Sequence, residues 1–178
     1  MSPKTDFVIK LLHVISWIIF IALCYQTGAL MFNYAFMQFQ VFPPENQYLL
    51  LDLSELFTQH KIYFGLLFGL AIGVNGLKAY TFYLITLIFQ YLNLHKPFSK
   101  EISSLISKIS YYILAVGILG AIAKGITEEL AKQGYPVENA YEHWDDYSAF
   151  LLMAAVVFVI AQIFKKGMEI QSENDLTV

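Results

Sequence analysis

Lys78 is the residue whose position most strongly suggests a chemical role. It lies in the middle of a long apolar run, in the stretch GLKAYTFYLI that begins at Gly76. A charged side chain at the centre of a bilayer costs about 2.5 kcal/mol or more on insertion scales, so it requires a partner, a route to the surface or a function. On a helix, Lys78 shares a face with Asn75, Thr81 and Phe82. We therefore single out Lys78 and Asn75 as intramembrane polar candidates.

Lys78 has three possible explanations. Its long side chain can snorkel to the membrane boundary or pair with an acid near it, and the acids available there are Asp52, Glu55, Asp145 and Asp146. Alternatively, it belongs to a ligand or ion site, or it transfers protons. A transporter normally has several ionisable groups within the membrane, and the other apolar runs have no Asp or Glu at their centres. This pattern favours snorkelling or structural pairing.

Residue groupings typical of enzymes or cofactor proteins are not evident. The histidines all fall near the ends of apolar runs, where they would not pair across a bundle as haem ligands: His13, His60, His95 and His143. The single cysteine, Cys24, argues against a thiol–quinone oxidoreductase, which needs cysteine pairs. No G-x-S-x-G, H-E-x-x-H or phosphate-loop motif is present. We therefore expect no enzymatic activity, no catalytic or metal-binding residues and no cofactor.

The composition indicates an integral membrane protein. Hydrophobic residues make up 57% of the 178 residues and charged residues only 14%, whereas a soluble domain carries about 25% charged residues. The net charge is -3 and the chain has no arginine, so neither a basic surface nor a bidentate phosphate clamp is available for nucleic acid. We expect the bilayer as a partner and no direct contact with nucleic acid.

Four apolar segments are long enough to cross a bilayer, which takes about 20 residues each. They cover residues 7–31, 62–92, 105–123 and 147–164. Backbone polar groups cannot remain unpaired in lipid, so these segments should be helices. The first run is longer than a signal-peptide core and lacks an A-x-A site, so we expect it to remain uncleaved. The fold class is all-α, an integral membrane four-helix bundle formed as one domain by residues 1–178.

The placement of lysines predicts the orientation. Seven lysines flank the apolar runs on one side: Lys4, Lys10, Lys96, Lys100, Lys108, Lys165 and Lys166. The other side has Lys61, Lys124 and Lys132. We therefore expect both termini in the cytoplasm. The outer segments are then residues 33–61 and 124–146, and residues 165–178 form a cytoplasmic tail.

The outer segments have features of their own. Residues 49–57 alternate apolar and acidic character and could form a short helix on the membrane surface. Trp144 and two neighbouring tyrosines, Tyr141 and Tyr147, are typical of interfacial anchors. The adjacent acidic group, residues 142–146, could hold a cation, but a solvated acidic cap is the favoured interpretation.

The link between the second and third spans is short. Pro97 should end the preceding helix and Ser99 should cap the next one. A short link joins antiparallel neighbours, so the second and third spans should form a hairpin.

Small residues recur every four positions in both of these spans. Gly65, Gly69 and Gly73 lie on one face of the second span, and Gly117 and Ala121, followed by Gly125, lie on one face of the third. Such faces allow helices to approach closely in a membrane. We expect the two faces to pack against each other within the chain, with a homodimer contact as the alternative.

Three short motifs carry a resemblance to a known family. They are Pro97-Phe98-Ser99, the AQIFKKG sequence that ends at Gly167, and the closing ENDLTV. Together they resemble the bacterial membrane proteins grouped as domain of unknown function 2975. The LKA and FYLI stretches around Lys78 resemble a subset found in Bacteroidetes. The resemblance covers nearly the whole chain, although Lys108 stands where many members have arginines after P-F-S.

The resemblance implies a four-span protein of the bacterial inner membrane with no established activity and no catalytic residues to carry over. Members are often encoded beside a small Cro-type helix-turn-helix regulator, which implies regulation linked to the membrane. We therefore expect a non-enzymatic regulatory or interaction protein that contacts a cytoplasmic partner, such as that regulator, through Lys96–Lys108 and the tail. The tail residues concerned are Glu173, Asn174, Asp175, Leu176, Thr177 and Val178.

The sequence also allows other interpretations of the tail and of the function. The tail could be a frayed end instead of a docked peptide. The protein could be a small transporter or channel subunit that uses Lys78 and Asn75, or an accessory subunit of a membrane enzyme. The oligomeric state is open.

Overall fold

The computed structural model describes residues 3–39, 51, 53–92 and 97–175. All regular secondary structure in this part of the chain is helical, which confirms the all-α prediction. The elements are α1 (Pro3–Phe39), α2 (Ser54–Gln59), α3 (Lys61–Tyr91), α4 (Lys100–Lys132), α5 (Glu138–Tyr141) and α6 (Tyr147–Asp175).

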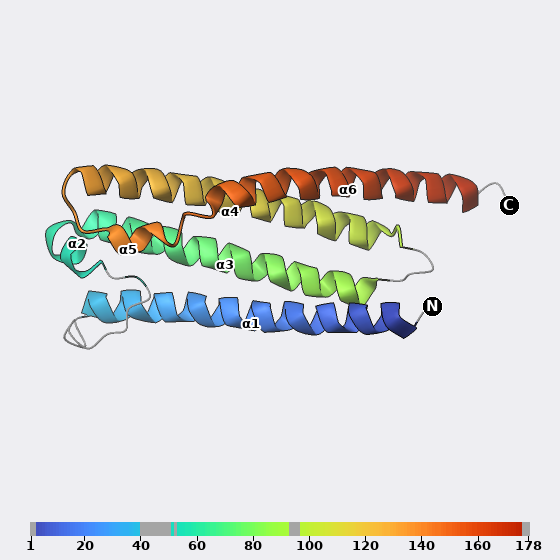
Figure 1. The fold of residues 1–178 in the computed structure, drawn as a ribbon, viewed down its shortest axis with the longest axis horizontal. Coiled ribbons are helices and arrows are strands. Elements are labelled where there is room, and N and C mark those ends of the chain that lie inside the picture. The colour runs from blue at the N-terminus through green and yellow to red at the C-terminus, as the bar shows by residue number, and fades with distance from the viewer. Residues whose placement is uncertain (1–2, 40–50, 52, 93–96, 176–178) are drawn as a thin grey trace.

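The four long helices lie side by side in the order α1, α3, α4, α6 (Figure 1). Both termini lie at the same end of the bundle, which we call the terminal end (Figure 1). The short helices α2 and α5 lie at the opposite end, which we call the loop end. In Figure 1, α1 follows the lower edge, and the upper edge is formed by α4 toward the loop end and by α6 toward the terminal end. Helices α1 and α6 are the first and last in the order of contacts, so they form the margins of the bundle.

All four long helices have the length and apolar composition needed to cross a membrane. Each overlaps one of the predicted spans, but α1, α4 and α6 continue past them, to Phe39, Lys132 and Asp175. The 33 residues of α4 would extend about 50 Å, against about 30 Å for a hydrocarbon core. The bundle therefore includes helix that lies outside the hydrocarbon.

The ends of α4 are fixed by local sequence. The Ser99 hydroxyl accepts a hydrogen bond from the backbone N–H of Ile102 at 3.2 Å, which confirms the predicted N-cap. At the other end, Gly134 has a φ of +87°. The N–H groups of Gly134 and Tyr135 donate to the carbonyls of Ala131 and Leu130, a Schellman motif that needs the left-handed conformation glycine tolerates.

A tightly packed core lies at the loop end. It joins Leu53 and Leu56 of the α2 region to Phe64 and Phe68 of α3 and to Trp144. The helix predicted within residues 49–57 is present as α2, but Leu56 is buried and the half-buried Phe57 packs against the same core, so this helix is packed into the protein and is not a free surface helix.

Trp144 is fully buried in this core, so its interpretation as an interfacial anchor is wrong. Val137, Ala140 and Trp144 are all fully buried, and their spacing of three and four residues is that of one helical face. This spacing in the sequence indicates a buried helical face. The tyrosines beside Trp144 suggested an interfacial anchor instead.

The predicted pairing of the two glycine faces is also wrong. A methyl group at Gly117 would lie 2.7 Å from Leu151 Cδ2, so the small residues of α4 admit α6 and not α3. A methyl group at Gly65 would have the Tyr34 hydroxyl of α1 as its nearest described neighbour at 3.9 Å, and a methyl group at Gly69 or Gly73 would meet no described atom of another element within 4 Å. Ala121 is only half-buried. Helices α3 and α4 instead pack through larger side chains, including Leu84 of α3 and Ile109 of α4.

Two close contacts bracket the first part of α6. A methyl group at Gly120 would lie 2.9 Å from Tyr147 Cβ, and one at Gly167 would lie 2.7 Å from the Phe98 ring. From Tyr147 to Gly167 the helix rises about 30 Å, which equals the thickness of a hydrocarbon core. The remainder of α6 projects past α1 and α3 at the terminal end (Figure 1).

Candidate functional site

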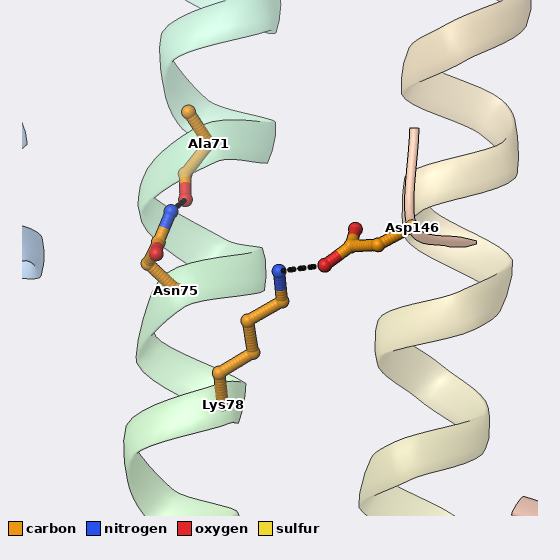
Figure 2. Close-up of polar contacts among 4 residues, drawn as sticks. All are labelled: Ala71, Asn75, Lys78 and Asp146. Atoms are coloured by element: carbon orange, nitrogen blue, oxygen red, sulfur yellow. Dashed lines mark hydrogen bonds and ion pairs between the residues drawn. The ribbon is translucent and has the colours of Figure 1, made fainter. Parts of the chain in front are cut away.

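Lys78 forms an ion pair with the segment that precedes α6. Its ammonium Nζ donates to Asp146 Oδ2 at 3.1 Å and lies 4.7 Å from the centre of the Phe150 ring. The Lys78 side chain is 17% exposed and that of Asp146 is 53% exposed. Figure 2 shows the lysine stem extending along α3 toward the loop end, where it reaches the carboxylate. The structure thus shows the predicted pairing, with Asp146 as the partner among the acids that the sequence offered.

A second ion pair lies beside the first. Lys124 of α4 contacts Asp145 Oδ1 at 3.3 Å, and its ammonium lies 5.5 Å from the centre of the Tyr147 ring. The consecutive acids Asp145 and Asp146 therefore tie the start of α6 to both α3 and α4. Sequence reasoning did not assign Lys124 to this cluster, because nothing in its own apolar run distinguishes it from a boundary lysine.

Asn75 does not join Lys78 in a common site. Its side-chain Nδ2 donates to the Ala71 carbonyl of the same helix at 3.0 Å (Figure 2). Thr81 behaves in the same way, donating to the Leu77 carbonyl at 2.8 Å. These side chains satisfy their own helix, as Ser, Thr and Asn commonly do inside membranes.

His143 lies next to the two ion pairs, outside the long helices. Burial lowers the pKa of its imidazole from the ordinary value of 6.5. The Glu142 carboxylate opposes this effect, and the Lys78 ammonium adds to it. Among the described residues, no group of three or more His, Cys, Asp or Glu side chains is arranged to hold a metal ion. Two acids of the predicted cation site, Asp145 and Asp146, pair with lysines.

An apolar groove of about 500 Å³ adjoins Lys78. All four long helices contribute to its lining, with α1 and α6 at its margins. Representative lining residues are Ile19 of α1, Phe82 of α3, Ile109 and Ile113 of α4, and Phe150 and Val157 of α6. Among the described residues of the lining, Lys78 is the only charged one.

The terminal end presents the second candidate surface. Phe98 packs edge-on against Phe164 with ring centres 5.3 Å apart, and it covers Gly167. This contact joins two of the motifs that suggested the family. Beyond it, α6 continues to Asp175 and Ile170 is 49% exposed.

Parts of the predicted partner-contact surface also lie here. Lys100 and Lys108 are exposed, and Glu173, Asn174 and Asp175 belong to α6. Lys96, Leu176, Thr177 and Val178 lie outside the described residues.

Four apolar helices and a lysine held by an acid at the end of a span define a multi-pass membrane protein. The family described as Protein of unknown function (DUF2975) matches residues 52–178, and the chain belongs to this family. The match starts just before α2 and leaves α1 outside it, a shorter extent than the sequence resemblance suggested. No curated protein and no solved structure matches the chain. The motif assignments and the Bacteroidetes subset stay predictions.

Proposed function

We propose that the protein is a non-enzymatic regulatory or interaction protein of the bacterial inner membrane. In this proposal the bundle holds the projecting part of α6, residues 168–175, for contact with a partner at the terminal end. The observation that carries the proposal is the continuation of α6 to Asp175, beyond the contact of Gly167 with Phe98.

The projecting part of α6 is too short to be a stable helix unless it continues a longer one. An isolated segment of eight residues would not remain helical in water, because stable isolated helices need about 12–15 residues or more. Continuity with the span supplies that support, and Phe98 restrains α6 at the point where the projection begins. The projection therefore presents its side chains in a set geometry, which lowers the entropy cost of binding.

The projection carries apolar and charged groups suited to a protein partner. Ile170 is exposed, although the helix has already risen through about 30 Å by Gly167. Glu169 of the projection pairs at 3.0 Å with Lys166, which lies just before it on α6. An exposed apolar group beside charged residues is typical of a protein contact.

The lysine distribution supports a cytoplasmic location for the terminal end. A cytoplasmic protein is then the expected partner, and the helix-turn-helix regulator implied by the family resemblance is the first to test.

The transporter alternative gains less support. Lys78 is paired with Asp146, Asn75 is hydrogen-bonded to its own helix, and the groove beside Lys78 is apolar. A path for ions or hydrophilic solutes would need several polar groups facing one cavity.

Site-specific photocrosslinking in cells tests the proposal. A photoreactive residue at Ile170 should yield one protein adduct identified by mass spectrometry. The matched control is Ile163, which is also exposed on α6 and lies seven residues earlier on nearly the same face. Because Ile163 falls between Tyr147 and Gly167, we expect lipid adducts or none at that position.

Two further results decide the interpretation. First, deletion of residues 173–178 from the chain that carries the photoreactive residue at position 170 should abolish the adduct. Second, the purified partner should bind the intact chain in a bilayer. Equal protein adducts at both positions, or no protein adduct at Ile170, would contradict a partner site at the projecting helix.

A further inference from the structure

We propose that the groove between α1 and α6 binds one anionic phospholipid of the leaflet at the loop end. One acyl chain would lie in the groove, and the phosphate would contact the Lys78 ammonium. This inference does not depend on the proposed partner at the terminal end.

The shape of the groove indicates an acyl chain. Its volume of about 500 Å³ falls in the usual range for small-molecule sites. Apart from Lys78 and Thr81, the described lining consists of isoleucine, leucine, valine, phenylalanine and methionine side chains. Thr81 already donates to the Leu77 carbonyl. A polar ligand would find almost no hydrogen-bonding partners here, whereas an alkyl chain has no hydrogen bonds to lose on entering the groove.

The position of the groove indicates a ligand from the bilayer. Its lining residues on α6 run from Phe150 to Ile160, within the segment bracketed by Tyr147 and Gly167. Its margins are α1 and α6, the first and last helices in the order of contacts across the bundle. The groove therefore opens sideways between these helices, toward lipid instead of water.

The charge at its end indicates an anionic headgroup. Lys78 has three N–H donors, and its described ion pair with Asp146 engages one oxygen of a half-exposed carboxylate. The lysine extends toward the loop end, where the headgroups of that leaflet would lie (Figure 2). A phosphate can share the ammonium with Asp146 or displace this exposed carboxylate.

Lys124 provides a matched control within the same charge cluster. It too pairs with an aspartate and lies near an aromatic ring, but it does not line the groove. Val157 and Val156 provide a second matched pair on α6, because Val157 lines the groove and Val156 faces outward.

The experiment is native mass spectrometry of the full chain released from nanodiscs. The nanodiscs would contain phosphatidylglycerol and phosphatidylcholine with identical acyl chains in equal amounts. We expect one phosphatidylglycerol retained per chain, and Lys78→Met should reduce its preference over phosphatidylcholine about tenfold, the effect of one charge-assisted hydrogen bond. Lys124→Met should leave the preference nearly unchanged. Val157→Trp should reduce retention of both lipids, whereas Val156→Trp should not.

Several outcomes would overturn the proposal. Equal retention of the two lipids by the unmodified chain would show a neutral alkyl site without headgroup recognition. Equal effects of Lys78→Met and Lys124→Met would indicate general surface charge. Lipid-free chains of dimer mass that form at the expense of the lipid adduct would assign the groove to a second copy. Lys78→Arg keeps the charge and should retain the preference, which guards against loss of folding in Lys78→Met.

Discussion

The two ends of the bundle are built in different ways. At the loop end, α2 and α5 cover the long helices, Trp144 fills the core, and two ion pairs join the start of α6 to its neighbours. At the terminal end, Phe98 packs on Phe164 and Gly167, and α6 then continues alone. One end is closed by packing and the other presents a helix. This difference is why we place partner binding at the terminal end.

Replacing Trp144 should give the largest effect on stability. Trp144→Ala removes a fully buried side chain and should lower the free energy of unfolding by about 3–5 kcal/mol. The other tryptophan of the chain, Trp17, lies exposed on α1, and Trp17→Ala should change stability by only about 0.5 kcal/mol. Equilibrium unfolding in detergent micelles measures both. Equal effects would show that the loop end is not a packed core.

Alanine substitutions at glycines should distinguish a helix face that packs against another helix from one that does not. Gly117→Ala forces a methyl group against Leu151 and should destabilise the protein by about 1–3 kcal/mol. Gly73→Ala meets no described atom within 4 Å and should stabilise α3 by up to about 1 kcal/mol. The same unfolding assay checks the pair. If Gly73→Ala destabilised the protein and Gly117→Ala did not, the predicted close packing of the α3 glycine face would be supported instead.

His143 should make the loop end sensitive to acid. Because its pKa is lower in the folded protein, the unfolded chain binds a proton first as the pH falls below the unfolded value near 6.5. Stability should therefore be full above that pH and decline as the pH falls through the lowered folded pKa. Unfolding measured across this range should show the decline, and His143→Gln should reduce it. An unchanged slope in His143→Gln would assign the acid sensitivity to other groups.

The two ion pairs should contribute least. Double-mutant cycles for Lys78 with Asp146 and for Lys124 with Asp145 should each give a coupling of about 0.2–1 kcal/mol, since both carboxylates are substantially exposed. The Lys78 pair should be the stronger, because its lysine is more buried and lies closer to an aromatic ring. A stronger coupling for the Lys124 pair would show that burial of the lysine does not determine which ion pair is stronger.

The sequence predicted the long helices well, because bilayer thickness and backbone hydrogen bonding leave few alternatives for long apolar runs. It also predicted the Ser99 cap and an acid near the boundary as the partner of Lys78. It did not predict which helix each glycine face meets, since small residues permit close approach without selecting a partner. The burial of Trp144 was missed for a related reason, because an aromatic residue beside acidic ones suits an interface as well as a core.

The most direct test of the account is the depth of α6 in a bilayer. Spin labels at Ile163, Ile170 and Ser172, in a Cys24→Ser background, would be compared for accessibility to oxygen and to a water-soluble nickel chelate. We predict that Ile163 lies in hydrocarbon, while Ile170 and Ser172 lie in water with the mobility of a helix. If Ile170 were as oxygen-accessible and as protected from nickel as Ile163, α6 would end inside the membrane and no helix would project to meet a partner.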